Sequence, residues 1–362
     1  MARIELRAIA HSYASTSQSS ERDFAVKPLD LIWEDGGAYA LLGPSGCGKT
    51  TLLGIISGLL RPTQGSIWMD GRDVTQLAPS RRNVAQVFQF PVIYDTMSVF
   101  DNLAFPLRNR GVSAVETRAR VERVAELLDL RSELARRASG LPGDLKQRIS
   151  LGRGLVRKDV AAILLDEPLT VIDPHLRWLL RRKLMEIHAE LRVTLIYVTH
   201  DQLEAMTLAD QVVVMRDGYV LQRGTPQALF ETPEHTFVGH FIGSPGMNLL
   251  PCSISNDAAL IAGQRVALPA AWRGLTGEFQ LGVRPEFVQL AAEPAPISVR
   301  GRIDQVAQLA GFNLVAARVG ELAVQIKSHG DELPEAGGEC WIAFPQQHSH
   351  LYRDGHRLEL GT

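Results

Sequence analysis

The sequence predicts two domains: an α/β domain built on a parallel sheet, followed by a smaller all-β domain. Three observations support this prediction. A glycine-rich segment, residues 43–50, lies between an apolar strand-like run and a helical run. Further apolar runs alternate with helical segments up to about residue 238. From about residue 250 the chain shows short strand-like segments separated by Gly and Pro, a spacing typical of a small antiparallel barrel.

Length and composition agree with this organisation. A chain of 362 residues exceeds the usual size of one compact domain. We place the first domain at residues 1–238, with a helical subdomain at about 90–157, and the second at 239–362. The net charge of −2 argues against a general nucleic-acid surface. Residues 3–8 alternate as an edge strand would, and they do not resemble a signal peptide.

The number of cysteines and the hydropathy of the sequence indicate in which surroundings the protein works. Its three cysteines have no paired spacing, which favours a reducing compartment and gives no zinc signature. No run of 18 apolar residues occurs, so we expect that any role at a membrane depends on a partner.

The glycine-rich segment matches the phosphate-binding pattern G-x-x-x-x-G-K-[ST]. Its glycines let successive N–H groups point at one anion, and the following helix N-terminus adds partial positive charge. Lys49 supplies a charge for the β and γ phosphates, and Thr50 a hydroxyl for Mg²⁺. The alternative is a glycine-rich turn that matches by chance, which the flanking strand and helix disfavour. The residues expected at the nucleotide here are Gly43, Pro44, Ser45, Gly46, Cys47, Gly48, Lys49, Thr50 and Thr51.

Polar residues at three further strand ends suit phosphate chemistry. The apolar run 161–165 ends in Asp166 and Glu167, of which the first would hold the metal and the second would polarise water. The alternative is an acidic turn. His200 follows the strand predicted at 194–198 and can reach the γ-phosphate, although a lone histidine is usually structural. Gln89 follows the strand predicted at 84–88 and can reach a metal or its water, although it is also an ordinary loop residue.

One more residue and one segment each have a structural and a functional interpretation. Tyr13 is either a half-buried loop aromatic or a ring that stacks on adenine, and the phosphate-binding motif favours stacking. Asp173 precedes Pro174 at the start of a predicted helix. The apolar residues between Phe90 and Phe100 are either subdomain core or a patch that receives another protein.

These motifs follow one another along the chain as they do in the ATP-binding subunit of ABC transporters, which the chain resembles. The resemblance implies ATP and Mg²⁺ as cofactors, with Thr50, Gln89 and Asp166 around the metal. It makes residues 43–50 the Walker A motif and 163–166 the Walker B motif. It makes Glu167 the catalytic glutamate and Gln89 the Q-loop glutamine. It places Asp173 in the D-loop, His200 in the H-loop switch and Tyr13 in the aromatic A-loop.

The C-terminal part, with residues 241–245 and 281–286, resembles the regulatory (TOBE-like) barrel of carbohydrate importers. Residues 88–95 and 150–156 look most like bacterial glycerol-import ATPases. The resemblance implies a peripheral subunit at the cytoplasmic face of the inner membrane, with two permease subunits and a periplasmic or surface solute-binding protein. The solute would be a small carbohydrate or polyol, with glycerol favoured.

Several alternatives stay open. The solute could be another sugar, a polyamine or a metal ion. The chain could be a regulatory nucleotide-binding subunit with little hydrolysis, or a soluble ATPase that acts on DNA or ribosomes. Long coiled-coil insertions and tandem ATPase domains, which the latter usually carry, do not occur here.

The sequence departs from the family in the signature motif, where L-S-G-G-Q is usual. With Gln147 and Arg148 as anchors, residues 141–146 read Leu-Pro-Gly-Asp-Leu-Lys. Pro142 replaces the serine that binds the γ-phosphate across the dimer, and Asp144 brings a like charge toward phosphate. We therefore expect a heterodimer with a second ATPase subunit whose signature is intact. A homodimer whose altered loop still works through its helix dipole is the alternative.

Overall fold

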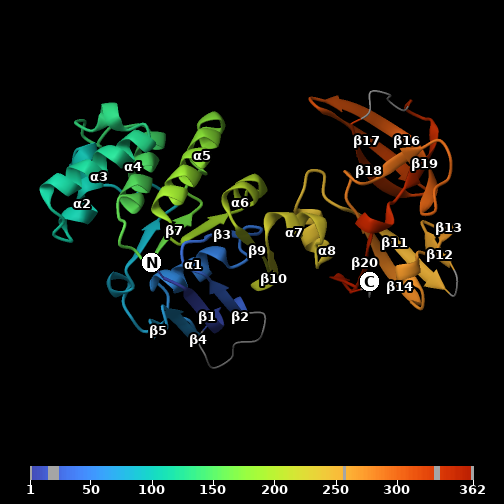
Figure 1. Cartoon of the computed structure of the whole chain (residues 1–362), viewed down its shortest axis with the longest axis horizontal. Coiled ribbons are helices and arrows are strands. Elements are labelled where there is room, and N and C mark those ends of the chain that lie inside the picture. The colour runs from blue at the N-terminus through green and yellow to red at the C-terminus, as the bar shows by residue number, and fades with distance from the viewer. Residues whose placement is uncertain (1, 15–23, 256–257, 330–334, 360–362) are drawn as a thin grey trace. The chain divides into compact units, whose positions relative to one another are not determined.

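The computed structural model describes residues 2–14, 24–255, 258–329 and 335–359, which belong to two compact units, residues 1–226 and 227–362 (Figure 1). The second unit includes helix α8 (Thr236–Phe241), which spans the boundary that the sequence suggested. That boundary, at residue 239, stays a prediction.

The first unit contains two sheets. The larger has the strand order β10-β9-β3-β8-β7-β6; its strands run parallel except β10, which forms a hairpin with β9. Every residue of β3, β7 and β8 is buried, which explains their unbroken apolar sequences. The strands of this sheet are β3 (Ala38–Leu42), β6 (Val84–Val87), β7 (Ala162–Asp166), β8 (Leu195–Thr199), β9 (Gln211–Arg216) and β10 (Tyr219–Gly224).

The smaller sheet corrects one prediction. Its order is β2-β1-β4-β5, so β1 is paired on both sides and is not an edge strand. The alternating pattern at residues 3–8 instead reflects a strand whose side chains on one face are buried. Asp70 and Gly71 form the turn of a hairpin between β4 and β5, and both residues have positive φ. The strands of this sheet are β1 (Ile4–Ser12), β2 (Phe24–Trp33), β4 (Gln64–Met69) and β5 (Arg72–Asp73).

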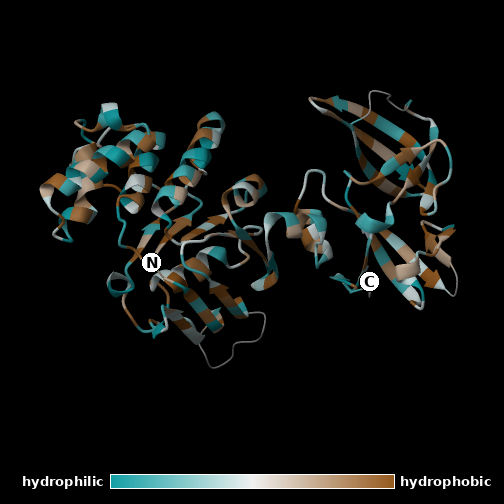
Figure 2. Ribbon diagram, in the orientation of Figure 1, coloured by the Kyte–Doolittle hydropathy of each residue, from teal (hydrophilic) through white to brown (hydrophobic). Residues whose placement is uncertain are grey.

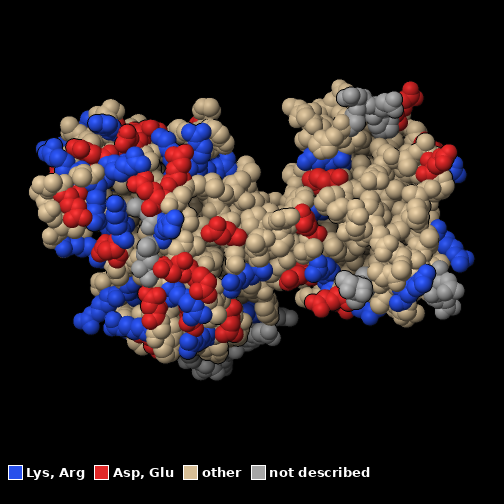
Figure 3. Space-filling view, viewed as in Figure 1, with Lys and Arg blue, Asp and Glu red and all other residues tan. Residues whose placement is uncertain are grey.

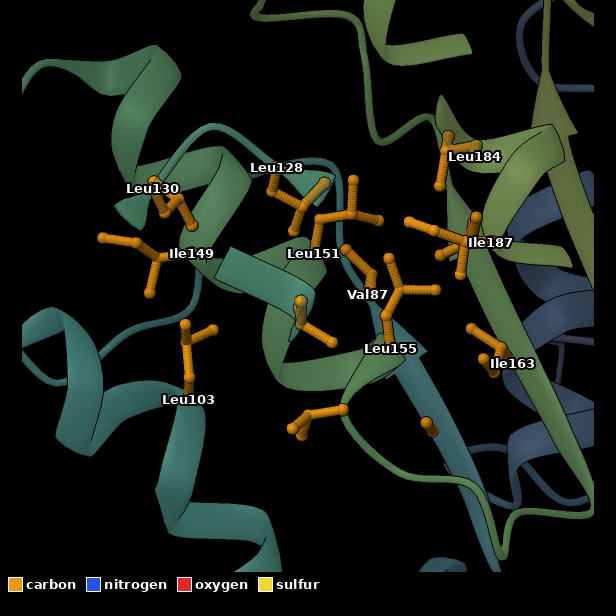
Figure 4. Packing of buried hydrophobic residues seen from close by; sticks show 14 of the residues in the cluster. Val87, Leu103, Leu128, Leu130, Ile149, Leu151, Leu155, Ile163, Leu184 and Ile187 are labelled. Carbon is orange, nitrogen blue, oxygen red and sulfur yellow. The ribbon is translucent and has the colours of Figure 1, made fainter. Parts of the chain in front are cut away.

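The predicted helical subdomain consists of α2 (Val99–Arg108), α3 (Ala114–Leu127) and α4 (Gly143–Leu155). Ser113 caps the start of α3, since Glu116 N donates to Ser113 Oγ at 3.3 Å. Leucine and isoleucine side chains of these helices pack in one core with Val87 of β6 and Ile163 of β7 (Figure 4). The subdomain is therefore packed directly on the edge of the larger sheet.

Three more helices in the first unit follow sheet strands along the chain: α1 (Lys49–Ser57), α5 (Pro174–Leu191) and α6 (Gln202–Leu208). Because β3, β7 and β8 are parallel neighbours, their carboxyl ends meet at one edge of the sheet. That edge receives the phosphate-binding segment, the Asp166–Glu167 pair and His200.

The second unit begins with α7 (Pro226–Glu231) and α8, and its described strands pair antiparallel throughout. They form two sheets, of order β13-β12-β11-β14-β20-β21 and β15-β19-β16-β17-β18, around one apolar core. Hydrophobic and hydrophilic residues alternate along several of these strands (Figure 2). This arrangement confirms the predicted small all-β domain. Its strands are β11 (Asn248–Ser255), β12 (Ala258–Ile261), β13 (Gln264–Ala267), β14 (Gly277–Val283), β15 (Gln289–Ala291), β16 (Ser298–Leu309), β17 (Phe312–Val319), β18 (Leu322–Ser328), β19 (Glu339–Ala343), β20 (His350–Arg353) and β21 (His356–Arg357).

Candidate active site

The phosphate-binding segment runs from the end of β3 into α1, and two of its glycines are required by close backbone contacts. A Cβ atom on Gly43 would lie 2.2 Å from Met215 O, and one on Gly48 would lie 2.3 Å from Ala25 O. Gly46 and Gly48 have φ of 80° and 102°, the left-handed region. A Cβ on Gly46 would meet nothing within 4 Å, so this side of the loop is open to a ligand.

Lys49 is the first residue of α1 and is 5% exposed. Its Nζ donates to Gly43 O at 2.7 Å and to Pro44 O at 2.8 Å, and it lies 3.8 Å from Cys47 Sγ. The described residues place no carboxylate within ion-pair distance of this ammonium, so its positive charge is available to an anion in the loop. Burial raises the pKa of the Cys47 thiol, which keeps that residue neutral.

Thr50 and Asp166 meet across two elements. The Thr50 hydroxyl donates to Asp166 Oδ1 at 3.2 Å. Burial raises the pKa of Asp166, while the Thr50 hydrogen bond opposes that rise. A hydroxyl beside a partly desolvated carboxylate is an oxygen-donor set suited to Mg²⁺. The residues present therefore fit a magnesium-bound triphosphate.

Glu167 follows β7 and adopts a φ of 45°, unusual for a residue with a Cβ. Its Oε1 lies 3.1 Å from His200 Nδ1. Its Oε2 accepts from Gln89 Nε2 at 3.4 Å and from Thr170 Oγ1 at 3.3 Å. The structure thus brings to one carboxylate two residues, Gln89 and His200, that the sequence placed at separate strand ends.

Sequence reasoning missed Thr170, because a threonine three residues after Glu167 gives no signal distinct from an ordinary turn. The roles predicted for Gln89 and Asp173 stay predictions. The Gln89 amide nitrogen faces the glutamate, and the Asp173 side chain accepts from His175 N at 2.9 Å at the start of α5.

Tyr13 lies beside the phosphate-binding segment. Its hydroxyl is 3.1 Å from Thr51 Oγ1, and its ring packs edge-on against His11 with centroids 4.7 Å apart. The side chain is 65% exposed, which leaves ring surface for stacking on a base. Its predicted role at adenine has geometric support and stays a prediction.

The region of the altered signature begins α4. Pro142 occupies the N-cap position, where the described residues supply no side-chain cap. Asp144 Oδ2 accepts from Arg148 at 2.8 Å, so the like charge that the sequence suggested is partly neutralised within the chain. The sequence did not indicate that Arg148 offsets the charge of Asp144, because this ion pair forms only if the helix begins at Gly143. Ser139 and Gly140 could supply the serine and glycine of the signature only if the motif were placed three residues earlier, and both lie upstream of the helix.

The fold and this site define an ATP-binding cassette. A family model described as ABC transporter matches residues 26–170, and one described as MalK OB fold domain matches residues 243–288. A dimeric, post-hydrolysis structure of an ATP-binding cassette bound to ADP and Pi aligns with a TM-score of 0.55 and 24% identity. It covers 62% of this chain and 98% of that one, and so supports the fold of the first unit.

Relatives that match over nearly their whole length indicate which kind of ABC protein this chain is similar to. The sn-glycerol-3-phosphate import ATP-binding protein UgpC of Salmonella typhi is 39% identical over 356 residues, which is 97% of this chain and 98% of the relative. The protein of the same name from Escherichia coli (strain UTI89 / UPEC) matches with the same identity and coverage. The chain belongs to the ABC transporter family and is an ATPase of the import type. Within the part of the chain that the structure describes, we find no helix of the length and hydropathy that a membrane span requires.

Proposed function

We propose that this protein hydrolyses ATP to drive the import of a small polyol phosphate, sn-glycerol 3-phosphate, through separate permease subunits. The observation that carries the proposal is the pairing of Thr50 with Asp166 and of Glu167 with His200 in a chain that is 39% identical to glycerol-3-phosphate import ATPases over nearly its whole length. The resemblance of residues 88–95 and 150–156 to glycerol-import ATPases favoured glycerol as the solute, whereas the names of the relatives favour its phosphate ester.

The residues divide the reaction between them. The loop N–H groups and Lys49 bind the phosphates and stabilise charge that develops on them. Thr50 and Asp166 would hold Mg²⁺, which supplies further charge neutralisation when bound. Glu167 would orient a water and accept its proton, and His200 would hold the glutamate and contact the γ-phosphate.

An exposed apolar patch would dock the permeases. Phe90, Val92 and Tyr94 are 70%, 52% and 40% exposed, on the loop between β6 and α2. The loop is not loose, because the buried Asn102 side chain accepts from Tyr94 N at 2.8 Å and donates to Tyr94 O at 2.9 Å. A fixed apolar surface joined to Gln89 is suited to pass motion between a partner and the site.

We propose that the chain works beside a second ATPase subunit, peripherally at the cytoplasmic face of the inner membrane. Pro142 supports this partnership, because it offers neither a hydroxyl nor an N–H to a nucleotide held by the facing subunit. A partner with an intact signature would complete the site built here.

Uptake tests the solute. In cells that lack this gene, the wild-type chain should restore uptake of radiolabelled sn-glycerol 3-phosphate, and Glu167→Gln should not. Glu186→Gln, an exposed carboxylate of α5 that pairs with Arg182, is the matched control and should restore uptake fully. Restoration of labelled glycerol uptake alone would refute the phosphate ester as the solute.

A charge in the patch tests the docking surface. Tyr94→Asp should abolish uptake while ATP binding to the purified chain changes less than twofold. Val115→Asp, at an 83% exposed position on α3, is the control and should leave uptake intact. Normal uptake by the Tyr94 variant would remove the patch from the coupling surface.

A further inference from the structure

One buried side chain of the helical subdomain joins the two segments that meet at the catalytic carboxylate. Gln147 lies in the second turn of α4 and is fully buried. Its Nε2 donates to Pro168 O at 2.9 Å and to Phe88 O at 3.2 Å. These carbonyls lie 21 and 59 residues away along the chain. Because both neighbours are acceptors, they determine which end of the amide faces them.

The two carbonyls adjoin the residues that do the chemistry. Pro168 directly follows Glu167, and Phe88 directly precedes Gln89. Gln89 in turn donates to Glu167 Oε2 at 3.4 Å. Gln147 therefore ties together the backbones on either side of the Gln89–Glu167 contact. Glu167 also holds a positive φ, a conformation that persists only where neighbouring contacts enforce it.

The other end of the same amide supports a specific role for its donors. Among the residues that the structure describes, Gln147 Oε1 has no hydrogen-bond partner although it is buried. A buried acceptor without a partner is unfavourable, whereas an apolar side chain of similar length would fill the space without that cost. The stabilisation that this side chain provides therefore rests on the two hydrogen bonds from Nε2.

We infer that Gln147 is a positioning residue for ATP hydrolysis, which fixes Glu167 and Gln89 relative to α4. The phosphate-binding segment is held separately, through Lys49 and the carbonyls of Gly43 and Pro44. Loss of the Gln147 donors should therefore lower the rate of hydrolysis and leave nucleotide binding unchanged. Because Gln147 is one turn from residues 141–145, it also gives a movement of α4 a direct path to the glutamate.

The test uses the full chain within its assembled transporter and measures MgATP hydrolysis without added solute, so it does not depend on the identity of the solute. Gln147→Met keeps the length of the side chain and removes both donors. We expect kcat to fall at least tenfold while KM for ATP stays within twofold. Ser150→Ala is the matched control: it removes the hydrogen bond that Ser150 Oγ, on the same helix, accepts from Val92 N at 3.3 Å, and kcat should stay within twofold.

A double-mutant cycle separates positioning from a general loss of structure. If Gln147 acts through the Gln89–Glu167 contact, adding Gln89→Ala to Gln147→Met should lower kcat by less than twofold more than the stronger single change. Full multiplication of the two losses would overturn the inference, as would a normal kcat in Gln147→Met. Should Gln147→Met melt more than 5 °C below wild type, Gln147→Leu, which is apolar and also lacks N–H donors, replaces it with the same criteria.

Discussion

Repair of the altered signature is the sharpest test of the proposed asymmetry. The perturbation is the double change Pro142→Ser with Asp144→Gly, which restores the usual residue types at the start of α4. Alone, the wild-type chain should hydrolyse ATP slowly, because each site in a pair of like chains would face an uncapped helix end and a carboxylate. The repaired chain should hydrolyse it faster.

The structure sets the expected size of this gain. A hydroxyl that donates to a phosphate oxygen contributes about 1.5–3 kcal/mol, as for other hydrogen bonds to charged groups. Removal of the Asp144 carboxylate relieves a repulsion of at most about 1 kcal/mol at water-like dielectric. Arg148 already reduces that second contribution through its 2.8 Å contact. A total near 2–3 kcal/mol corresponds to a rate increase of about 30- to 150-fold.

The assay is steady-state phosphate release by the purified chain, with melting temperature as the control for folding. Ser139→Ala is the matched variant, because Ser139 lies upstream of α4 and should have no effect on the rate. A wild-type chain that already hydrolyses ATP as fast as the repaired one would refute the asymmetric arrangement. A loss of activity in Ser139→Ala would instead show that the motif lies three residues earlier.

Three further predictions each concern one residue. Arg284 is 2% exposed and donates to four carbonyls, of which two belong to α7, one to α8 and one to the residue after α8. Burial lowers the pKa of this guanidinium to about 10. Arg284→Met should cost about 3–5 kcal/mol and lower the melting temperature of the second unit by about 10–15 °C in calorimetry, unlike Arg265→Met at an exposed site. Burial raises the pKa of Asp166, so its contribution to stability is full below the unfolded pKa of about 3.9 and is lost as pH rises through the folded pKa. Asp166→Asn should therefore raise the melting temperature of the nucleotide-free chain more at pH 7.5 than at pH 4.5, and an equal gain at both would contradict the cause. Tyr13→Ala should weaken ATP binding by about fivefold, or 1 kcal/mol of stacking, measured by titration calorimetry, whereas Tyr13→Phe, which loses only the hydroxyl near Thr51, should bind within twofold.

Much of the site could be predicted because its residues lie in short segments whose conformation has local causes. The glycine pattern before Lys49 demands a loop that curls around an anion, and the strand that ends in Asp166 and Glu167 places two carboxylates at a sheet edge. Local periodicity likewise predicted the helical subdomain and the all-β second domain. On the face of the first unit that Figure 3 shows, positive and negative side chains are interspersed.

Only the tertiary structure decided which distant residues meet. The pairing of β1 on both sides depends on strands far apart in sequence, so alternation alone could not establish it. The convergence of Gln89 and His200 on the Glu167 carboxylate depends on strand order in the sheet. The bridge from Gln147 to two carbonyls depends on how α4 packs against the sheet edge. Sequence fixes backbone conformation where the causes are local, whereas contacts between segments depend on the packing of the whole unit.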